Sequence, residues 1–188
     1  MLWINTGPWL LLHLLLQGAV GERKWDYEPV FVSTHTTDER QLKIGSKIDR
    51  LKRGEFAISA SLEWNYDVDE TTMVEGHAFR SFSGDESAYK LIPLSIPTTT
   101  FSKFIDTYYK DVFITNLGNC SNLPKFKRKF QLPWPRGTYN LTQCVFNGKG
   151  LPEVLPLGYY KIFFSASGDN EQPTWGFVVI LHITAKFF

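Results

Sequence analysis

Residues that could act in catalysis are spread thinly along this chain. After the first 21 residues the histidines are His35, His77 and His182, far apart in the sequence. The chain has no G-x-S-x-G elbow, phosphate-binding glycine loop, H-E-x-x-H helix or C-x-x-C pair. Because a serine and an aspartate can be matched in space with almost any histidine, this spacing indicates no particular reaction. We expect surface or hydrogen-bonded histidines and no enzymatic activity.

Acidic residues gather at Asp67, Asp69 and Glu70. Carboxylates can bind a cation, but these lack the spacing of a calcium-binding loop, and a solvated turn is the more ordinary interpretation. We therefore expect no metal and no cofactor.

The basic residues concentrate in one run, Lys125-Phe126-Lys127-Arg128-Lys129-Phe130. The formal net charge of the chain is only +1, which gives no general attraction to nucleic acid. Lys127, Arg128 and Lys129 could contact an anionic lipid head group or membrane surface, since aromatic side chains settle at such an interface. The alternative is a solvated loop whose two phenylalanines pack inward.

Two cysteines, Cys120 and Cys144, are the other reactive groups. An even count in a secreted domain predicts one disulfide, with two free buried thiols as the alternative. Asn140 and Asn119 each begin an N-glycosylation pattern. A disulfide at Cys120 would restrict access to Asn119.

Large apolar side chains are more numerous than a modest β-sandwich needs in order to close. They could fill a solid core or line a cavity between two splayed sheets, and the pattern alone leaves both interpretations open. His77, Tyr108 and Tyr139 are candidates for polar groups that orient a ligand. The candidate inward residues are Phe56, Ile58, Leu62, Trp64, Phe79, Tyr108, Phe146, Ile162, Phe164, Phe177 and Val179.

Short strands and tight turns must position these residues. In Leu132–Phe164, prolines and glycines recur too often for a helix and favour strands joined by short loops. One period of three and four residues, from about Thr100 to Asp111, predicts an amphipathic helix. Strands are expected at 24–33, 41–48, 56–66, 72–82, 88–96, 138–146, 159–167 and 175–186.

Alternation along these strands predicts which side chains share a face. In Phe56–Tyr66 the large apolar residues face one way, and Ser59, Ser61 and Glu63 face the other. The last strand is apolar on both faces through Ile180, which indicates a central position. Strict alternation in the strand from 138 would put Cys144 on the face of Asn140, opposite Tyr139. The fold class we expect is all-β, a two-sheet sandwich with one short helix.

The first 21 residues are typical of a secretory signal peptide. Their apolar region, from Trp9 to Leu16, is too short to span a bilayer comfortably, and Ala19 and Gly21 are small residues before a cleavage point. The alternative is a membrane anchor or a buried helix. We therefore expect a secreted, extracellular protein with a single domain at 22–188.

The chain also resembles a known family. The stretches Pro133–Tyr139 and Leu155–Lys161, with Cys144 between them, resemble the C-terminal half of the ML-type lipid-recognition superfamily, to which the ganglioside-activator protein belongs. Trp25–Pro29 and Trp175–Val179 fit the same group, and the nearest branch is the insect chemosensory proteins of the Che-A type. Members often carry several disulfides, against at most one here.

This resemblance implies an immunoglobulin-like β-sandwich or β-cup with an apolar cavity between its sheets. It implies a non-enzymatic carrier of a lipid or other apolar small molecule, in the insect branch for gustatory or pheromone sensing. The alternative is a secreted interaction module with a filled core, which docks on a receptor or an anionic membrane surface.

Overall fold

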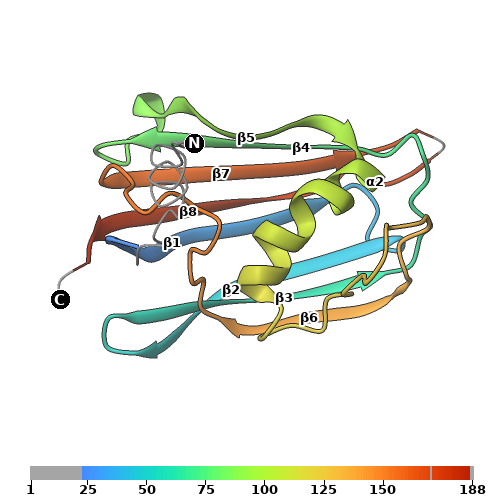
Figure 1. Ribbon diagram of the computed structural model, residues 1–188, viewed down its shortest axis with the longest axis horizontal. Coiled ribbons are helices and arrows are strands. Elements are labelled where there is room, and N and C mark those ends of the chain that lie inside the picture. The colour runs from blue at the N-terminus through green and yellow to red at the C-terminus, as the bar shows by residue number, and fades with distance from the viewer. Residues whose placement is uncertain (1–22, 170, 187–188) are drawn as a thin grey trace, which may run out of the picture.

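The computed structural model describes residues 23–169 and 171–186, and the expected signal peptide lies outside them. Within these residues eight strands form two antiparallel sheets, one of five strands and one of three. Figure 1 shows the sheets as two layers with a helical segment crossing obliquely from the end of β5 toward the smaller sheet. The expected all-β sandwich is therefore confirmed.

The larger sheet has the order β1-β8-β7-β4-β5. β8 lies between β1 and β7, so the central position predicted from its two apolar faces is confirmed. β1 forms an edge of this sheet, a position that tolerates its Pro29, and its register with β8 shifts just after this proline. The bounds are Trp25–Thr36 for β1, Met73–Ser81 for β4, Lys90–Thr100 for β5, Gly158–Ser167 for β7 and Trp175–Ala185 for β8.

The smaller sheet has the order β2-β3-β6, with bounds Leu42–Lys52, Glu55–Trp64 and Gly137–Cys144. In β3 the register places Ile58, Leu62 and Trp64 on the face toward the larger sheet, as the alternation predicted. The opposite face is polar and carries ion pairs such as that between Lys43 and Glu63. This sheet therefore has one dry face and one wet face.

The helical segment is longer than predicted. It begins at Phe101, where the hydroxyl of Thr100 accepts a hydrogen bond from the Lys103 backbone N–H (3.4 Å), and it ends at Leu117 rather than near Asp111. Its middle is wound as a π-helix, which changes the spacing that a 3.6-residue period assumes. The parts are α2 (Phe101–Phe104), η2 (Ile105–Ile114) and α3 (Thr115–Leu117), and a short 3₁₀ turn, η1, spans Glu86–Ala88.

An aromatic cluster joins this helix to both sheets. Trp134, only 4% exposed, lies at its centre. Its ring centroid is 5.6 Å from that of Trp64 on β3 and 5.7 Å from that of Phe101 on α2. Trp64 in turn meets Trp175 of β8 edge-to-face at 5.3 Å. The helix is therefore held between the sheets by ring packing as well as by its cap.

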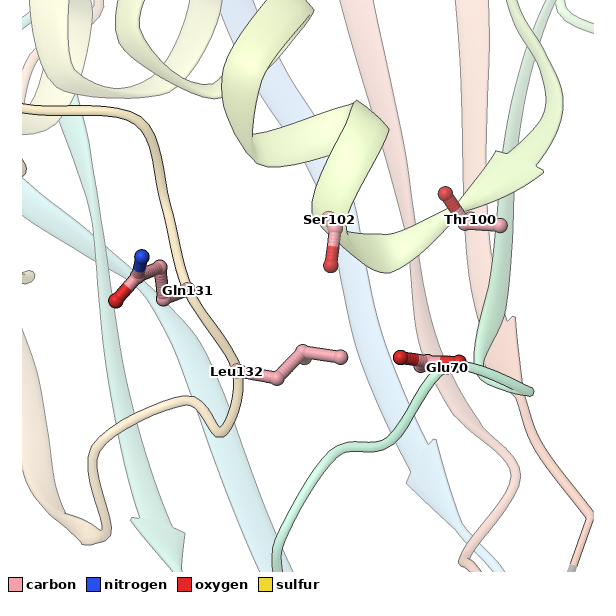
Figure 2. A pocket seen from close by; sticks show the side chains of 5 residues that line it. All are labelled: Glu70, Thr100, Ser102, Gln131 and Leu132. Carbon is pink, nitrogen blue, oxygen red and sulfur yellow. The ribbon is translucent and has the colours of Figure 1, made fainter.

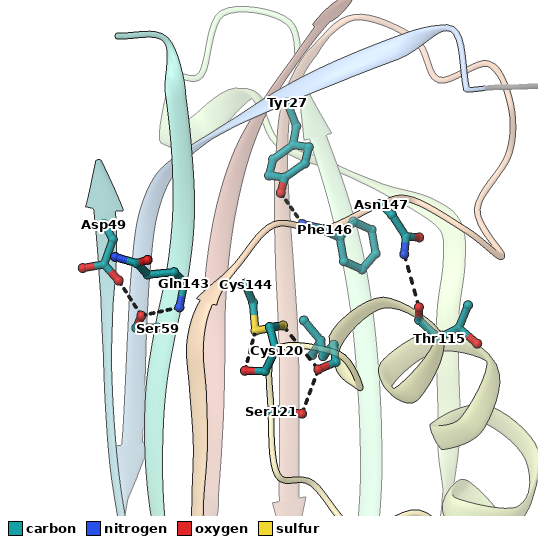
Figure 3. Close-up of a disulfide and its surroundings, with 11 residues drawn as sticks. Tyr27, Asp49, Ser59, Thr115, Cys120, Ser121, Gln143, Cys144, Phe146 and Asn147 are labelled. Carbon is teal, nitrogen blue, oxygen red and sulfur yellow. Dashed lines mark hydrogen bonds between the residues drawn. A yellow bond between two sulfur atoms is a disulfide. The ribbon is translucent and has the colours of Figure 1, made fainter. Parts of the chain in front are cut away.

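The disulfide between Cys120 and Cys144 is confirmed, with the Cα atoms 5.4 Å apart. It joins the segment after α3 to the end of β6, as Figure 3 shows. Strict alternation gave the wrong face for Cys144. The β3–β6 register shifts between Leu141 and Cys144, and Gln143 adopts a φ of 48°, so Cys144 turns inward and is buried.

The outer face of the larger sheet carries large apolar side chains among polar ones such as His77 and Ser165. One row crosses all five strands through Phe31, Ile180, Lys161, Phe79 and Leu91. Phe31 is 46% exposed and Leu91 is 62% exposed. The two outer faces of the sandwich therefore differ in polarity.

The positive φ of Gln143 leads to a stability prediction. Replacing Gln143 with Val should lower the free energy of unfolding by about 1–2 kcal/mol, because a β-branched side chain resists this conformation. Gln143→Gly should avoid that loss, since glycine adopts positive φ freely. Thr138→Val on the same strand is the control, and urea unfolding is the measurement. Equal stability of the Val and Gly variants at position 143 would contradict the prediction.

Candidate functional site

The middle of the inter-sheet space is lined by side chains that are only partly buried. On the larger sheet Val32, Ile162 and Val179 face the smaller sheet, and on the smaller sheet Ile48 and Ile58 face back. Each of these five residues keeps part of its surface exposed, although each points toward the opposite sheet. Inward apolar residues of a tightly closed sandwich would lose that exposure, because sandwich interiors are closely packed.

The five partly exposed residues, Val32, Ile48, Ile58, Ile162 and Val179, form a band across the inter-sheet space, and a cluster of buried residues lies at each end of it. On one side is the aromatic cluster, which includes Trp64 and Trp175. On the other side Trp25, Tyr160 and Ile183 form a second, smaller cluster. The partly exposed residues lie between the clusters along the strands, where an apolar ligand would be bounded at both ends.

The loop from 145 to 157 connects these parts along one side of the sandwich. It binds the start of β1, because the indole Nε1 of Trp25 donates to the Pro152 carbonyl (2.9 Å) and the Phe146 N–H donates to the Tyr27 hydroxyl (2.5 Å). It also binds the end of the helical segment, where the Gly148 N–H donates to Asn116 Oδ1 (3.0 Å). Figure 3 shows the Tyr27 contact and a further one from Asn147 to the Thr115 carbonyl.

The structure divides the eleven predicted cavity residues into groups. Leu62, Trp64, Phe164, Phe177 and Tyr108 belong to the aromatic cluster or pack against it. Ile58, Ile162 and Val179 lie in the partly exposed band, and Phe56 is a partly buried residue at the start of β3 on the same face. Phe146 lies in the connecting loop, edge-to-face with Tyr27 at 6.3 Å.

Phe79 and His77 lie elsewhere. Both are on the outer face of the larger sheet, since Phe79 is opposite Lys161 and His77 is opposite Phe163. His77 Nε2 is 3.6 Å from Glu75 Oε2. Tyr139, the other predicted orienting residue, does face inward, but its hydroxyl already donates to the Pro135 carbonyl.

Several residues that shape the interior did not stand out in the sequence. Phe104 and Tyr109 come from the helical segment, whereas Phe130 and Trp134 come from the long connection before β6. The sequence gave two hints of them, namely the apolar period of the predicted helix, which includes Phe104, and the two phenylalanines of the basic run in the inward-packing alternative. Phe126 and Phe130 do pack inward, with ring centroids 4.9 Å apart.

Two grooves open at the surface. The first, of about 630 Å³, lies at the start of α2 and is lined by Glu70, Thr100, Ser102, Gln131 and Leu132. Figure 2 shows the Glu70 carboxylate and the Leu132 side chain pointing toward each other across it, while Gln131 points away. Thr100 is already engaged as the helix cap.

The second groove, of about 690 Å³, lies between η2 and the basic loop 125–129. It contains Lys127, Arg128 and Lys129, the three predicted anion contacts, and adds Lys110 and Lys125. All five cations are exposed.

The carboxylates of Asp67 and Asp69 form hydrogen bonds within the protein. Asp67 receives two hydrogen bonds of 2.8 Å from Arg136, and this guanidinium lowers the pKa of the carboxyl. The Asp69 carboxylate accepts hydrogen bonds from the Thr71 backbone N–H and hydroxyl. Within residues 23–169 and 171–186, no group of His, Cys, Asp and Glu is arranged to hold a metal ion. In the same ranges, no helix has the length and apolar character needed to cross a membrane.

Both glycosylation patterns lie at the surface. Asn140 is exposed on β6 and faces away from the larger sheet, opposite Ser61. Asn119 is also exposed, next to the partly buried Cys120 of the disulfide.

The family comparison covers the centre of the fold. Residues 74–162 match a family described as "Protein of unknown function (DUF1091)". This stretch runs from β4 into β7, so it contains the helical segment, the basic loop, β6 and both cysteines. A search of curated proteins found no match. The similarity therefore links the chain to a family whose description states no activity.

Two buried phenols provide a test of the aromatic cluster. Tyr109 donates to the Pro124 carbonyl (2.9 Å), and Tyr66 accepts a hydrogen bond from the Trp175 indole (2.8 Å). Burial raises the pKa of both phenols above the usual value of 10. An unfolded tyrosine ionises near pH 10, so the folded state should lose stability as the pH rises above about 10.

Absorbance titration of tyrosinate, with circular dichroism followed in parallel, checks this prediction. Tyr66 and Tyr109 should resist ionisation until the protein unfolds. Burial also raises the pKa of Tyr27, Tyr89, Tyr139 and Tyr160, so these phenols should ionise above pH 10 as well. Tyr109→Phe should remove one resistant group and cost about 1 kcal/mol for the lost hydrogen bond. Ionisation of all eight tyrosines near pH 10 with the fold intact would contradict it.

Proposed function

We propose that this protein is a secreted, non-enzymatic carrier that binds a lipid or other apolar small molecule between its two sheets. The partly exposed band is the observation that supports the proposal most directly. Val32, Ile48, Ile58, Ile162 and Val179 present aliphatic surface toward the space between the sheets, although such surface is ordinarily buried in a sandwich.

Burial of hydrocarbon would supply the binding free energy. Each square ångström of apolar surface removed from water contributes roughly 25 cal/mol, so a ligand that covers these side chains gains affinity without specific polar contacts. Near the band the inward hydroxyls include that of Thr34, which donates to the Ile44 carbonyl (3.2 Å), and that of Ser46, which lies on β2 between the inward Ile44 and Ile48. This lining favours a ligand that is mainly hydrocarbon.

The superfamily assignment is part of the same proposal. The ML-type lipid-recognition superfamily accounts for a two-sheet sandwich with an apolar space, and the DUF1091 similarity is compatible with it. Within that superfamily we propose a relative of the Che-A type chemosensory proteins, acting in taste or pheromone detection. The disulfide suits the oxidising compartment that secretion implies. Mass spectrometry of lipids that co-purify with the protein from its native host tests this finer assignment.

The competing function is a secreted interaction module with a filled core. The aromatic cluster favours it in part, since rings occupy one end of the inter-sheet space. The two functions differ in their need for the band between the clusters, because only a carrier requires that this band remain open to a ligand.

Two neighbouring residues of β8 separate these functions. Val179 faces the band, whereas Val178 is opposite Phe163 on the outer face. Val179→Phe should fill part of the space and weaken binding of a fluorescent fatty acid or sterol by about tenfold or more, the equivalent of about 1.4 kcal/mol. Val178→Phe makes the same chemical change outside the space and should leave binding unchanged.

Displacement titrations measure the affinities, and thermal unfolding shows that both variants fold. If Val179→Phe does not fold, Ala60→Leu is the inward substitute and Ser61→Leu its outward control, since Ala60 and Ser61 alternate on β3. The absence of saturable binding to any apolar ligand class would overturn the carrier proposal. Equal loss of binding in the inward and outward variants would show that the ligand binds outside the inter-sheet space.

A further inference from the structure

The groove between η2 and the basic loop combines two kinds of surface. Its floor includes Ile105, Tyr109 and Ile114 from the helix and Phe126 from the loop. Its remaining lining is charged: five cations, Lys110, Lys125, Lys127, Arg128 and Lys129, and one carboxylate, Asp106. Apolar floor and cationic rim therefore lie within one concave surface.

The cations are free to act on a ligand. Within residues 23–169 and 171–186, none of the five forms an ion pair with a protein carboxylate. By contrast, Lys47 and Lys52 elsewhere on the surface are each 2.8 Å from a carboxylate oxygen. The one acid in the groove, Asp106, is already used, since its Oδ1 accepts a hydrogen bond from the Phe130 N–H (3.0 Å).

The loop is braced by its own aromatic residues. The ring of Phe126 packs against Trp134 (5.6 Å between centroids) and Tyr109 (6.2 Å), and Phe130 is buried in the same cluster. Since both phenylalanines are held inside, the intervening Lys127, Arg128 and Lys129 are presented to solvent on an anchored segment. Anchoring of this kind reduces the entropy lost when the cations engage a ligand.

A bare inorganic anion would use only the rim of this groove, and a neutral hydrocarbon would use only the floor. We propose that the groove is a second ligand site, separate from the inter-sheet space, which binds an anionic amphiphile. Its phosphate or carboxylate head lies among the cations and the first part of its hydrocarbon chain covers Ile114 and Phe126. The volume of about 690 Å³ lies within the range of small-molecule sites. The site does not depend on the carrier function.

Dodecyl phosphate, kept below its micelle concentration, is the probe for isothermal titration. Lys127→Gln, Arg128→Gln and Lys129→Gln combined should weaken its binding by about tenfold, because three exposed cations that each contribute modestly are removed together. Added salt should weaken binding in the natural chain and have less effect in the variant. The matched control combines Lys43→Gln, Lys47→Gln and Lys52→Gln, which removes the same charge from the smaller sheet's polar face and hairpin end.

A second set of titrations tests the contribution of the ligand's hydrocarbon chain. Dodecyl phosphate should bind more tightly than butyl phosphate or inorganic phosphate, and Ile114→Asn should reduce that difference. Dodecanol and dodecyltrimethylammonium should not bind at this groove. Equal affinity for inorganic phosphate and dodecyl phosphate, or equal effects of the two triple variants, would overturn the proposal.

Two further experiments show where the amphiphile binds and whether the protein recognises a single molecule or a membrane surface. The titration is repeated on Val179→Phe, which should retain dodecyl phosphate binding at the groove; loss of all binding would place the amphiphile between the sheets and overturn the second site. Binding to vesicles of phosphatidylcholine with phosphatidylserine, without binding of the monomeric probe, would overturn a single-molecule site in favour of a membrane surface. Failure of the carrier titration leaves both of these readouts intact.

Discussion

The packing of Trp134 between the helical segment and the smaller sheet, which reaches the larger sheet through the contact of Trp64 with Trp175, is the interaction on which the rest of the structure depends. A two-sheet sandwich usually brings its inner faces together so that their side chains interdigitate. Here a helix and a long connection supply a third set of rings, and Trp134 touches both Trp64 of β3 and Phe101 of α2. The sheets therefore meet through an aromatic wedge at one end. Farther along the strands, Ile58 and Val179 remain partly exposed.

The helical segment and the loop 125–129, which supply these rings, border both candidate sites. One surface of the helical segment packs on the core through Phe104 and Tyr109, and the groove lined by Ile114 and Lys110 lies on its solvent side. The loop 125–129 contributes Phe126 to the cluster and its cations to the groove. A single anchored unit, helix plus loop, thus bounds the interior and forms the charged surface outside it.

Much of the fold could be predicted from the sequence because β3 and β8 have unambiguous patterns. The faces of β3 follow simple alternation, and the uninterrupted apolar run of β8 matches its central position. The placements of Phe79 and His77 were harder, since the inward positions of β4 are Val74, Gly76 and Ala78, which are small. The largest apolar residue of that strand lies outside. Size was therefore a poor guide where both faces of a sheet carry large apolar side chains.

The interior of the site was less predictable, for reasons that lie outside local pattern. The inward turn of Cys144 depends on a bulge at Gln143, a residue type that carries no strong preference for positive φ. The role of Trp134 depends on a connection between elements, where no period applies. The π-helical winding of η2 likewise alters which of its residues share a face. The function itself rests on how filled the inter-sheet space is, a property of packing that the sequence leaves open.

The unlike outer faces of the sandwich give the molecule a preferred orientation at any boundary between water and an apolar phase. Both outer faces carry ion pairs, but the larger sheet also exposes the apolar Phe31 and Leu91, whereas the smaller sheet exposes Asn140. At a waxy or oily surface the lower free energy is reached with the five-stranded sheet against that surface and Asn140 in water. Adsorption at such a boundary would therefore favour one orientation of the molecule over the opposite one.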